Sequence, residues 1–122
     1  MTNTFSPKNA NTILYCRKWQ ETVDFYKDCL GLPITHNEGW FIEFKLTETA
    51  HISIADESRA SIKSCRGASV TLALQVESAE KTWQYLRSSG LVIEPVREHP
   101  WGAHVFYFSD PEGHRIEVWS PK

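Results

Sequence analysis

Hydrophobic and polar residues alternate over several short stretches of the chain, with turn-forming residues between them. Alternation with a period of two is typical of a β-strand that buries one face and leaves the other open. In the first half of the chain the pattern predicts strands at residues 13–16, from 33 onward, at 40–46 and at 51–55. In the second half it predicts strands at residues 70–76, 92–96, 104–108 and 115–119.

Apolar residues with helical spacing follow the first predicted strand of each half. The first helix is expected over residues 20–30 and ends before Gly31, which tolerates the backbone conformation that closes a helix. The second helix is expected to start at the N-cap Ser78 and to end at Gly90. The apolar residues that define the two buried helix faces are Val23, Tyr26 and Leu30 in the first helix and Ala79, Trp83 and Leu86 in the second.

The order strand, helix, strand, strand, strand therefore occurs twice. The last two strands of each half keep the same step, because Phe44 and Ile52 are as far apart as Phe108 and Ile116. We expect an α+β fold of two tandem βαβββ modules, forming a curved mixed sheet around a cleft with the helices on the outer face. The expected organisation is a single domain over residues 1–122, with module one at about 11–55, a linker at 56–68 and module two at about 69–119.

Each predicted sheet has one apolar face, which a helix can cover, and one face of mixed character. A face of mixed character that curves around a cleft is suited to bind a ligand. The residues expected on these open faces are Asn11, Ile13, Tyr15, Phe41, Glu43, His51 and Ser53 in the first half and Thr71, Ala73, Gln75, Val105, Tyr107, Arg115, Glu117 and Trp119 in the second.

Composition and charge exclude some classes of function. The net charge of −2 argues against nucleic acid as a partner, because phosphate contacts need a basic face. No apolar run is long enough for a membrane span, and no leader pattern is present, so we expect no membrane association. The three cysteines form no C-x-x-C pair and are expected to be reduced thiols of a cytoplasmic protein.

Two segments resemble a known family. They are TVDFYKDCLGL, from Thr22 to Leu32, and FSDPEGHRIEVW, from Phe108 to Trp119. With the duplicated βαβββ order, they resemble the vicinal oxygen chelate superfamily of glyoxalases, dioxygenases, fosfomycin-resistance enzymes and bleomycin-resistance proteins. The stretch HPWGAHVFYFSDPEGHRIEV most resembles the bleomycin-resistance group. The resemblance implies a small-molecule site in the cleft and a pair of chains that complete each other's clefts.

The same resemblance implies where a catalytic metal would be held. The positions that correspond to ligands of the metal-using members are Asn11, Ser53, Thr71 and Glu117, of which only Glu117 is a competent ligand. We therefore expect no metal and no other cofactor. An alternative set of Glu43, His51 and Glu117 remains open. His114 is expected in a turn, exposed to solvent.

Aromatic residues on the open faces suit a flat organic molecule. Trp101 is expected on a turn, either as a lip over the cleft or as an anchor of the turn itself. Glu117 is the best candidate for an acid/base group, although a pairing with Arg115 that orients a ligand or borders a dimer contact is favoured. The expected ligand-binding residues are Tyr15, Phe41, Glu43, Ser53, Thr71, Trp101, Tyr107, Arg115, Glu117 and Trp119.

The leading hypothesis is a metal-free homodimer that sequesters an aromatic or amphipathic ligand such as an antibiotic. Glu43 and Glu117 would attract cationic ligands of the bleomycin type, although Lys45 and Arg115 weaken that effect. The alternative is a glyoxalase-type lyase, isomerase or hydrolase with a non-standard metal set that includes Glu117. A lesser hypothesis is a regulatory module that uses the fold to contact another protein.

Overall fold

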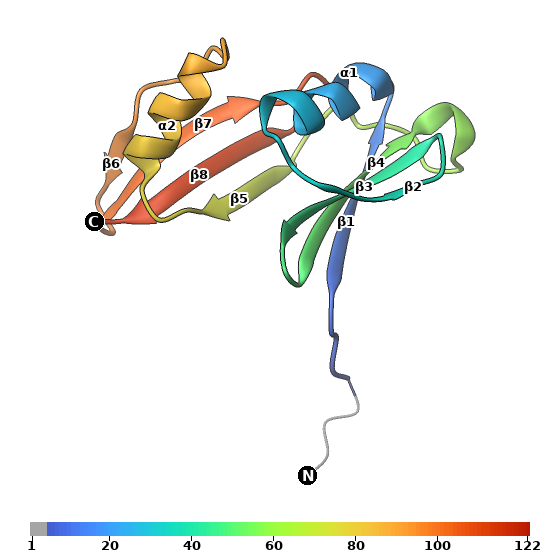
Figure 1. Cartoon of the computed structure of the whole chain (residues 1–122), viewed down its shortest axis with the longest axis horizontal. Helices are drawn as coiled ribbons and strands as arrows, with labels where there is room; N and C mark the ends of the chain where they lie inside the picture. The colour runs from blue at the N-terminus through green and yellow to red at the C-terminus, as the bar shows by residue number, and fades with distance from the viewer. Residues whose placement is uncertain (1–4) are drawn as a thin grey trace. The chain divides into compact units, whose positions relative to one another are not determined.

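The computed structural model describes residues 5–122 as two compact units that divide after Ser64, and each unit contains a four-stranded sheet (Figure 1). The first sheet has the strand order β1-β4-β3-β2, in which β1 is parallel to β4 and the other neighbours are antiparallel. Its strands are β1 (Ala10–Cys16), β2 (Ile34–Asn37), β3 (Phe41–Thr47) and β4 (Ala50–Asp56).

The second sheet repeats this arrangement in the order β5-β8-β7-β6, again with a parallel first pair. Its strands are β5 (Thr71–Gln75), β6 (Arg97–His99), β7 (Ala103–Ser109) and β8 (Arg115–Pro121). The repeated step between the last two strands has a structural origin, because Phe44 pairs with Ile52 and Phe108 pairs with Ile116 across the two antiparallel ladders. The predicted α+β fold of two tandem βαβββ modules is confirmed.

A helical segment follows the first strand in each unit. In the first unit α1 (Trp19–Asp24) continues into a π-helical turn (Phe25–Cys29), and a short 3-10 turn (Glu57–Arg59) follows β4. In the second unit α2 (Ala79–Ser88) is capped by the Ser78 side chain, which accepts a hydrogen bond from the Lys81 N–H at 3.2 Å. Gly31 and Gly90, as expected, follow the helices with positive φ angles of 66° and 89°.

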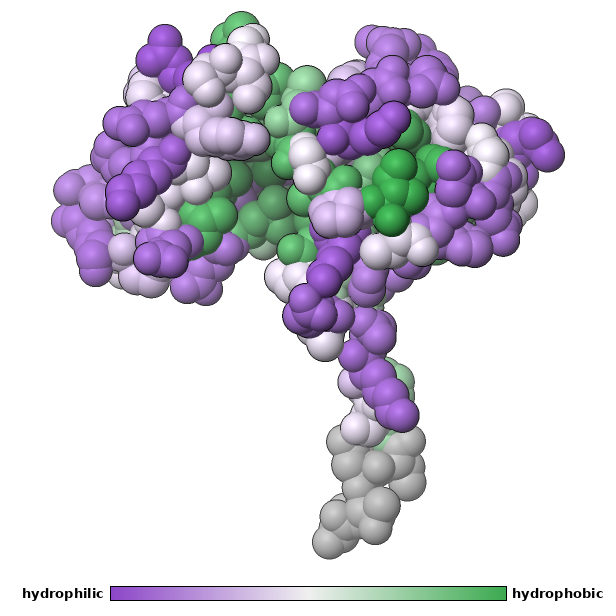
Figure 2. Space-filling view, in the orientation of Figure 1, coloured by the Kyte–Doolittle hydropathy of each residue, from purple (hydrophilic) through white to green (hydrophobic). Residues whose placement is uncertain are grey.

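The helix-facing side of each sheet forms its hydrophobic core. Helix α2 packs against β7 and β8, and its outward-facing side is hydrophilic (Figures 1 and 2). Burying a large apolar side chain stabilises the folded state by about 1.5–3 kcal/mol relative to leaving it in water. The largest fully buried apolar residues on this side are Tyr26, Phe44, Ile52 and Ile54 in the first unit and Phe106 and Ile116 in the second. Val105 is also fully buried, but it lies on the opposite face of its sheet. No described helix is long and apolar enough to cross a membrane.

The prediction of a strand at residues 92–96 was wrong. Residues 91–96 form an irregular segment, and the strand that pairs with β7 is the three-residue β6. Pro95 has no N–H to donate to a neighbouring strand. The Trp83 indole donates a hydrogen bond to the Glu94 carbonyl at 2.9 Å, so this carbonyl is not available to accept from a neighbouring strand. Val92 is 98% exposed although its neighbours alternate as in a buried strand.

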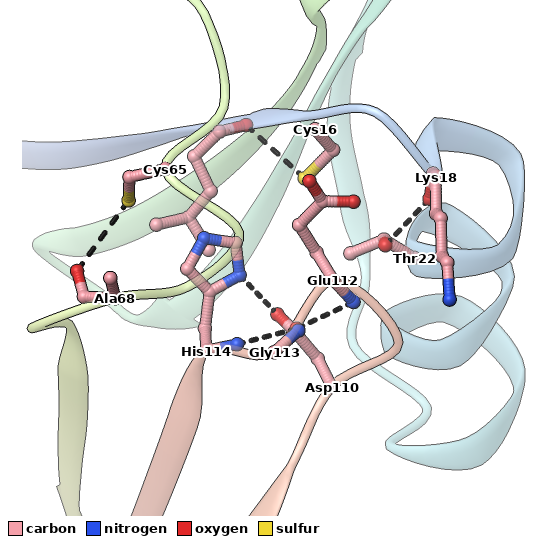
Figure 3. A network of polar contacts seen from close by, with 10 residues as sticks. Cys16, Lys18, Thr22, Cys65, Ala68, Asp110, Glu112, Gly113 and His114 are labelled. Atoms are coloured by element: carbon pink, nitrogen blue, oxygen red, sulfur yellow. Dashed lines mark hydrogen bonds and ion pairs between the residues drawn. The ribbon is translucent and has the colours of Figure 1, made fainter.

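The turn between β7 and β8 is organised around a buried aspartate (Figure 3). Asp110 Oδ1 accepts hydrogen bonds from the N–H groups of Glu112, Gly113 and His114 at 2.9 to 3.0 Å. Asp110 Oδ2 lies 2.8 Å from His114 Nδ1. The prediction that His114 is exposed to solvent was therefore wrong, since its exposed fraction is 2%. The turn fixes the register in which β8 presents its side chains.

Candidate functional site

The open face of the second sheet carries the largest group of the predicted site residues. Strand β8 is central, so each of its outward side chains has neighbours on both β5 and β7. The cross-strand neighbours on this face are Thr71 and Ser109 beside Arg115, Ala73 and Tyr107 beside Glu117, and Gln75 and Val105 beside Trp119.

Tyr107 lies at the centre of the side-chain contacts on this face. Its phenol oxygen lies 3.2 Å from His99 Nε2 on β6. Burial raises the pKa of the Tyr107 phenol, and the charge and hydrogen bond of Glu117 raise that pKa further. The phenol is therefore a neutral hydrogen-bonding group near neutral pH. When it donates its proton to Glu117, its oxygen can accept a hydrogen bond from His99.

Aromatic rings continue from Tyr107 along the edge of the same sheet. The His99 ring lies 6.5 Å from the Tyr107 ring and 5.6 Å from the Trp101 ring, measured between centroids. Trp101 meets Trp119 edge to face at 5.7 Å. Trp101 lies in the turn between β6 and β7 and is 61% exposed. This row of rings presents apolar surface to solvent, where it is available to stack against a planar ligand.

Two depressions in the protein surface adjoin Tyr107. The larger has a volume of about 510 Å³ and is lined by Glu94, Arg97, Glu98, His99, Tyr107 and Arg115. A smaller one of about 220 Å³ shares Tyr107 and Arg115 with it. The larger volume is in the range of sites for small organic molecules. Arg97 and His99 were not among the predicted site residues, and the HPWG segment that contains His99 was the only signal for them.

The open face of the first sheet carries a polar network instead of an aromatic row. Asn11 Oδ1 accepts a hydrogen bond from the Ser53 hydroxyl at 2.9 Å, and Asn11 Nδ2 donates to Glu43 at 3.2 Å. The other Glu43 oxygen accepts from the Thr35 hydroxyl at 2.7 Å. The fourth member, Thr35, was missed because β2 is too short to show an alternating pattern.

Two predicted aromatic residues lie at the far end of this first open face. Tyr15 and Phe41 are both paired with Ala55, one from each side of β4. The Phe41 ring also meets the Trp40 ring at 5.5 Å. The small Ala55 side chain leaves the space above β4 to these two rings. Tyr15 and Phe41 therefore lie on the same face of the first sheet.

The residues at the metal positions of the superfamily do not fit a metal. Asn11 and Ser53 are hydrogen-bonded to each other. The Thr71 hydroxyl accepts a hydrogen bond from Arg115 Nε at 3.1 Å, so a guanidinium cation already contacts this residue and disfavours a second cation beside it. Within neither described unit do three or more His, Cys, Asp or Glu residues gather as metal ligands would. The set of Glu43, His51 and Glu117 draws on both units and remains a prediction.

Comparison with known proteins agrees with the fold. The family model of the glyoxalase/bleomycin resistance protein/dioxygenase superfamily matches residues 10–118, and the chain belongs to this superfamily. A relative, the uncharacterized protein YraH of Bacillus subtilis (strain 168), is 33% identical over 118 residues, which cover 87% of this chain and 92% of YraH.

Three solved structures share the fold. A glyoxalase/bleomycin resistance protein/dioxygenase from Nocardioides has a TM-score of 0.80 and 20% identity, covering 98% of this chain and 86% of that one. The lactoylglutathione lyase of Agrobacterium tumefaciens has a TM-score of 0.74 and 18% identity, covering 98% and 95%. TnmS3, an antibiotic binding protein from Streptomyces sp. CB03234, has a TM-score of 0.73 and 16% identity, covering all of both chains.

Proposed function

We propose that this chain is a small-molecule binding protein that captures an aromatic or amphipathic organic molecule on the open faces of its sheets, without a catalytic metal. The observation that carries the proposal is the partly exposed row of rings formed by His99, Trp101 and Trp119, which continues to Tyr107 beside the larger depression. Aromatic side chains bring large apolar area and preferred stacking geometry to a planar ligand.

The chemistry of the metal positions supports binding over metal catalysis. Asn11 and Ser53 use their polar atoms in a network with Glu43, and Thr71 accepts from a guanidinium. A catalytic metal normally needs several anionic or imidazole ligands that are free to coordinate it. The antibiotic-binding description of TnmS3 shows that this fold serves as a binding protein elsewhere, and supports an antibiotic-like ligand here.

We further propose that the protein acts as a cytoplasmic homodimer, with ligand sequestration leading to resistance. All three cysteines are free thiols, which supports a reducing compartment. The assembly proposal rests on the family resemblance, and sedimentation velocity tests it, because a monomer mass at micromolar concentration would contradict it. Two isologous sites are expected in such a dimer.

Trp101→Ala is expected to weaken binding of a planar aromatic ligand about tenfold, because it removes the most exposed ring of the row. The measurement is quenching of intrinsic tryptophan fluorescence while a panel of planar aromatic antibiotics is titrated into the protein. Isothermal calorimetry gives the affinity of any member of the panel that quenches.

Tyr85→Ala is the matched control, because Tyr85 is 64% exposed but lies on helix α2, which packs on the other side of the sheet. Its affinity for the same ligand should equal that of the wild type. Equal affinities for the wild type and Trp101→Ala would contradict a role of the aromatic row in binding.

A second candidate function is a glyoxalase-type lyase, isomerase or hydrolase. The observation that favours it is the hydrogen-bonded group of His99, Tyr107 and Glu117, which can move a proton along a short path. Glu117 would be the acid/base residue, and Tyr107 would position its carboxylate.

The two functions separate in the response to Glu117→Gln. An enzyme loses turnover of a glyoxalase-type substrate by about a hundredfold or more, while its affinity for the substrate changes little. A binding protein shows no turnover in either form.

Metal analysis of the untagged protein, after dialysis against zinc, manganese, iron and nickel in turn, tests the same choice independently. About one equivalent per chain that is lost in Glu117→Gln would contradict the binding proposal.

A further inference from the structure

We propose that the ligand carries an anionic group, a carboxylate or a similar oxyanion, which pairs with Arg115 while the aromatic body of the ligand stacks on the neighbouring rings. This inference rests on the proposed binding function and names the chemical class of its ligand. The sequence left the charge of the ligand open, since Glu43 and Glu117 would attract a cation while Lys45 and Arg115 weaken that effect.

Arg115 lines the larger depression and is held there by two contacts. Its Nε donates to the Thr71 hydroxyl at 3.1 Å, and its guanidinium carbon lies 4.8 Å from the centre of the Tyr107 ring. These two contacts use one N–H group and one face of the guanidinium. The two terminal nitrogens keep a planar pair of donors, which is the arrangement that binds a carboxylate through two parallel hydrogen bonds.

The carboxylates around the larger depression are engaged by other groups. Glu98 pairs with Lys122 at 3.1 Å and with His104 at 3.5 Å, and Lys122 is the main cause of the lowered pKa of Glu98. Glu94 lies 3.6 Å from Arg97. Among the described residues Arg115 has no carboxylate within ion-pair distance, so its charge is the uncompensated one of this depression.

Glu117 is the remaining negative charge on this face. Its carboxylate is the cross-strand neighbour of the neutral Tyr107 phenol, and Glu117 does not line the larger depression. Arg97 and Arg115 line it together with Glu94 and Glu98, and of these four charged groups Arg115 alone has no ion-pair partner among the described residues. An oxyanion in this depression therefore has the Arg115 guanidinium as its available cation.

The cation and the rings lie close enough to contact one small molecule. Tyr107 touches both groups, because the Arg115 guanidinium lies over its ring and the His99 imidazole contacts its hydroxyl. His99 in turn leads to Trp101. A molecule with a planar aromatic body and a carboxylate at one end matches this order of groups.

The test compares three probes of one shape that differ only in charge. They are 2-naphthoate, 2-naphthylmethanol and 2-naphthylmethylammonium, titrated by calorimetry at low ionic strength into the wild type, Arg115→Gln and Arg87→Gln. Arg87 is the matched control, because its guanidinium also lies over an aromatic ring, Trp83, at 4.7 Å but outside the proposed site. Both variants are first shown to unfold at the wild-type temperature or within a few degrees of it.

We expect wild-type protein to bind 2-naphthoate about fivefold or more tightly than the neutral alcohol, which corresponds to an ion pair at a partly solvated site. Arg115→Gln should bind 2-naphthoate and the alcohol with about equal affinity, whereas Arg87→Gln should keep the wild-type preference. Raised salt should narrow the difference between the probes.

The possible failures are distinguishable. If the ammonium probe binds most tightly, or if Arg115→Gln keeps the preference for 2-naphthoate, the inference is overturned and the binding function stands. If none of the three probes binds, the proposed function fails, and the inference fails with it.

Discussion

Asp110→Ala is expected to lower the free energy of unfolding by about 3–5 kcal/mol, because it removes one partner of a buried, charge-assisted hydrogen-bond network. The side chain accepts from three backbone N–H groups and contacts the His114 ring. Its loss leaves the N–H groups of the buried Glu112 and His114 without this acceptor, whereas the Gly113 N–H keeps its bond to the Asp110 carbonyl at 3.0 Å. Urea denaturation followed by tryptophan fluorescence measures the effect.

Asp110→Asn is the informative companion variant. The amide oxygen of asparagine can still accept the backbone hydrogen bonds, whereas the contact of His114 with a charged oxygen is lost. We expect a smaller loss of stability, about half as large. Asp28→Ala is the control, because Asp28 is exposed, and it should change stability by less than about 0.5 kcal/mol. Equal stabilities of Asp110→Ala and Asp28→Ala would show that the turn does not depend on this carboxylate.

Gly67→Ala is expected to lower the free energy of unfolding by more than about 3 kcal/mol, because the new methyl group collides with backbone and not with a movable side chain. A Cβ atom at Gly67 would lie 2.1 Å from the carbonyl carbon of Gly113 and 2.3 Å from its oxygen. The φ angle of 80° at Gly67 adds strain for any L-residue. The substitution therefore pushes the β7–β8 turn away from the segment that precedes β5.

Gly39→Ala separates the collision from the backbone strain. Gly39 has nearly the same φ angle, 84°, but a Cβ atom added there would have no other atom within 4 Å. The substitution should cost about 1 kcal/mol, the strain contribution alone. If the two variants prove equally stable in thermal and urea unfolding, the close approach of Gly67 to Gly113 contributes nothing.

Both large effects concern the same part of the molecule as the proposed site. The turn after β7 sets the register of β8, and β8 supplies Arg115, Glu117 and Trp119 to the open face. A milder variant of the turn should therefore weaken ligand binding before it unfolds the protein. Stability and affinity need to be measured on the same samples for this reason.

The repeat could be predicted because its signals are local. Alternating residues mark strands, and the step from Phe44 to Ile52 recurs from Phe108 to Ile116, so one ladder register implies the other. Helix ends are also encoded locally, by residues such as Ser78 and Gly90. The open-face residues followed from these elements by alternation alone.

The local signals failed where a distant partner decides the outcome. Residues 92–96 alternate like a strand, but the indole of Trp83 binds the Glu94 carbonyl and β7 pairs with the next three residues instead. His114 follows a turn sequence that normally lies at the surface, yet Asp110 and the backbone around Gly67 enclose that turn.

The sequence by itself determined the class of fold, the duplication and the face on which each candidate residue lies, because strand and helix periods depend on residues close together in the chain. Only the tertiary structure decided which of those residues contact each other. The network of Asn11, Ser53 and Glu43 and the contact between Arg115 and Tyr107 join different strands, and their geometry depends on the register and rotamers of packed side chains. The residue types at this family's metal positions could therefore be identified from the sequence and the family resemblance. The lack of an ion-pair partner for Arg115 among the described residues could not.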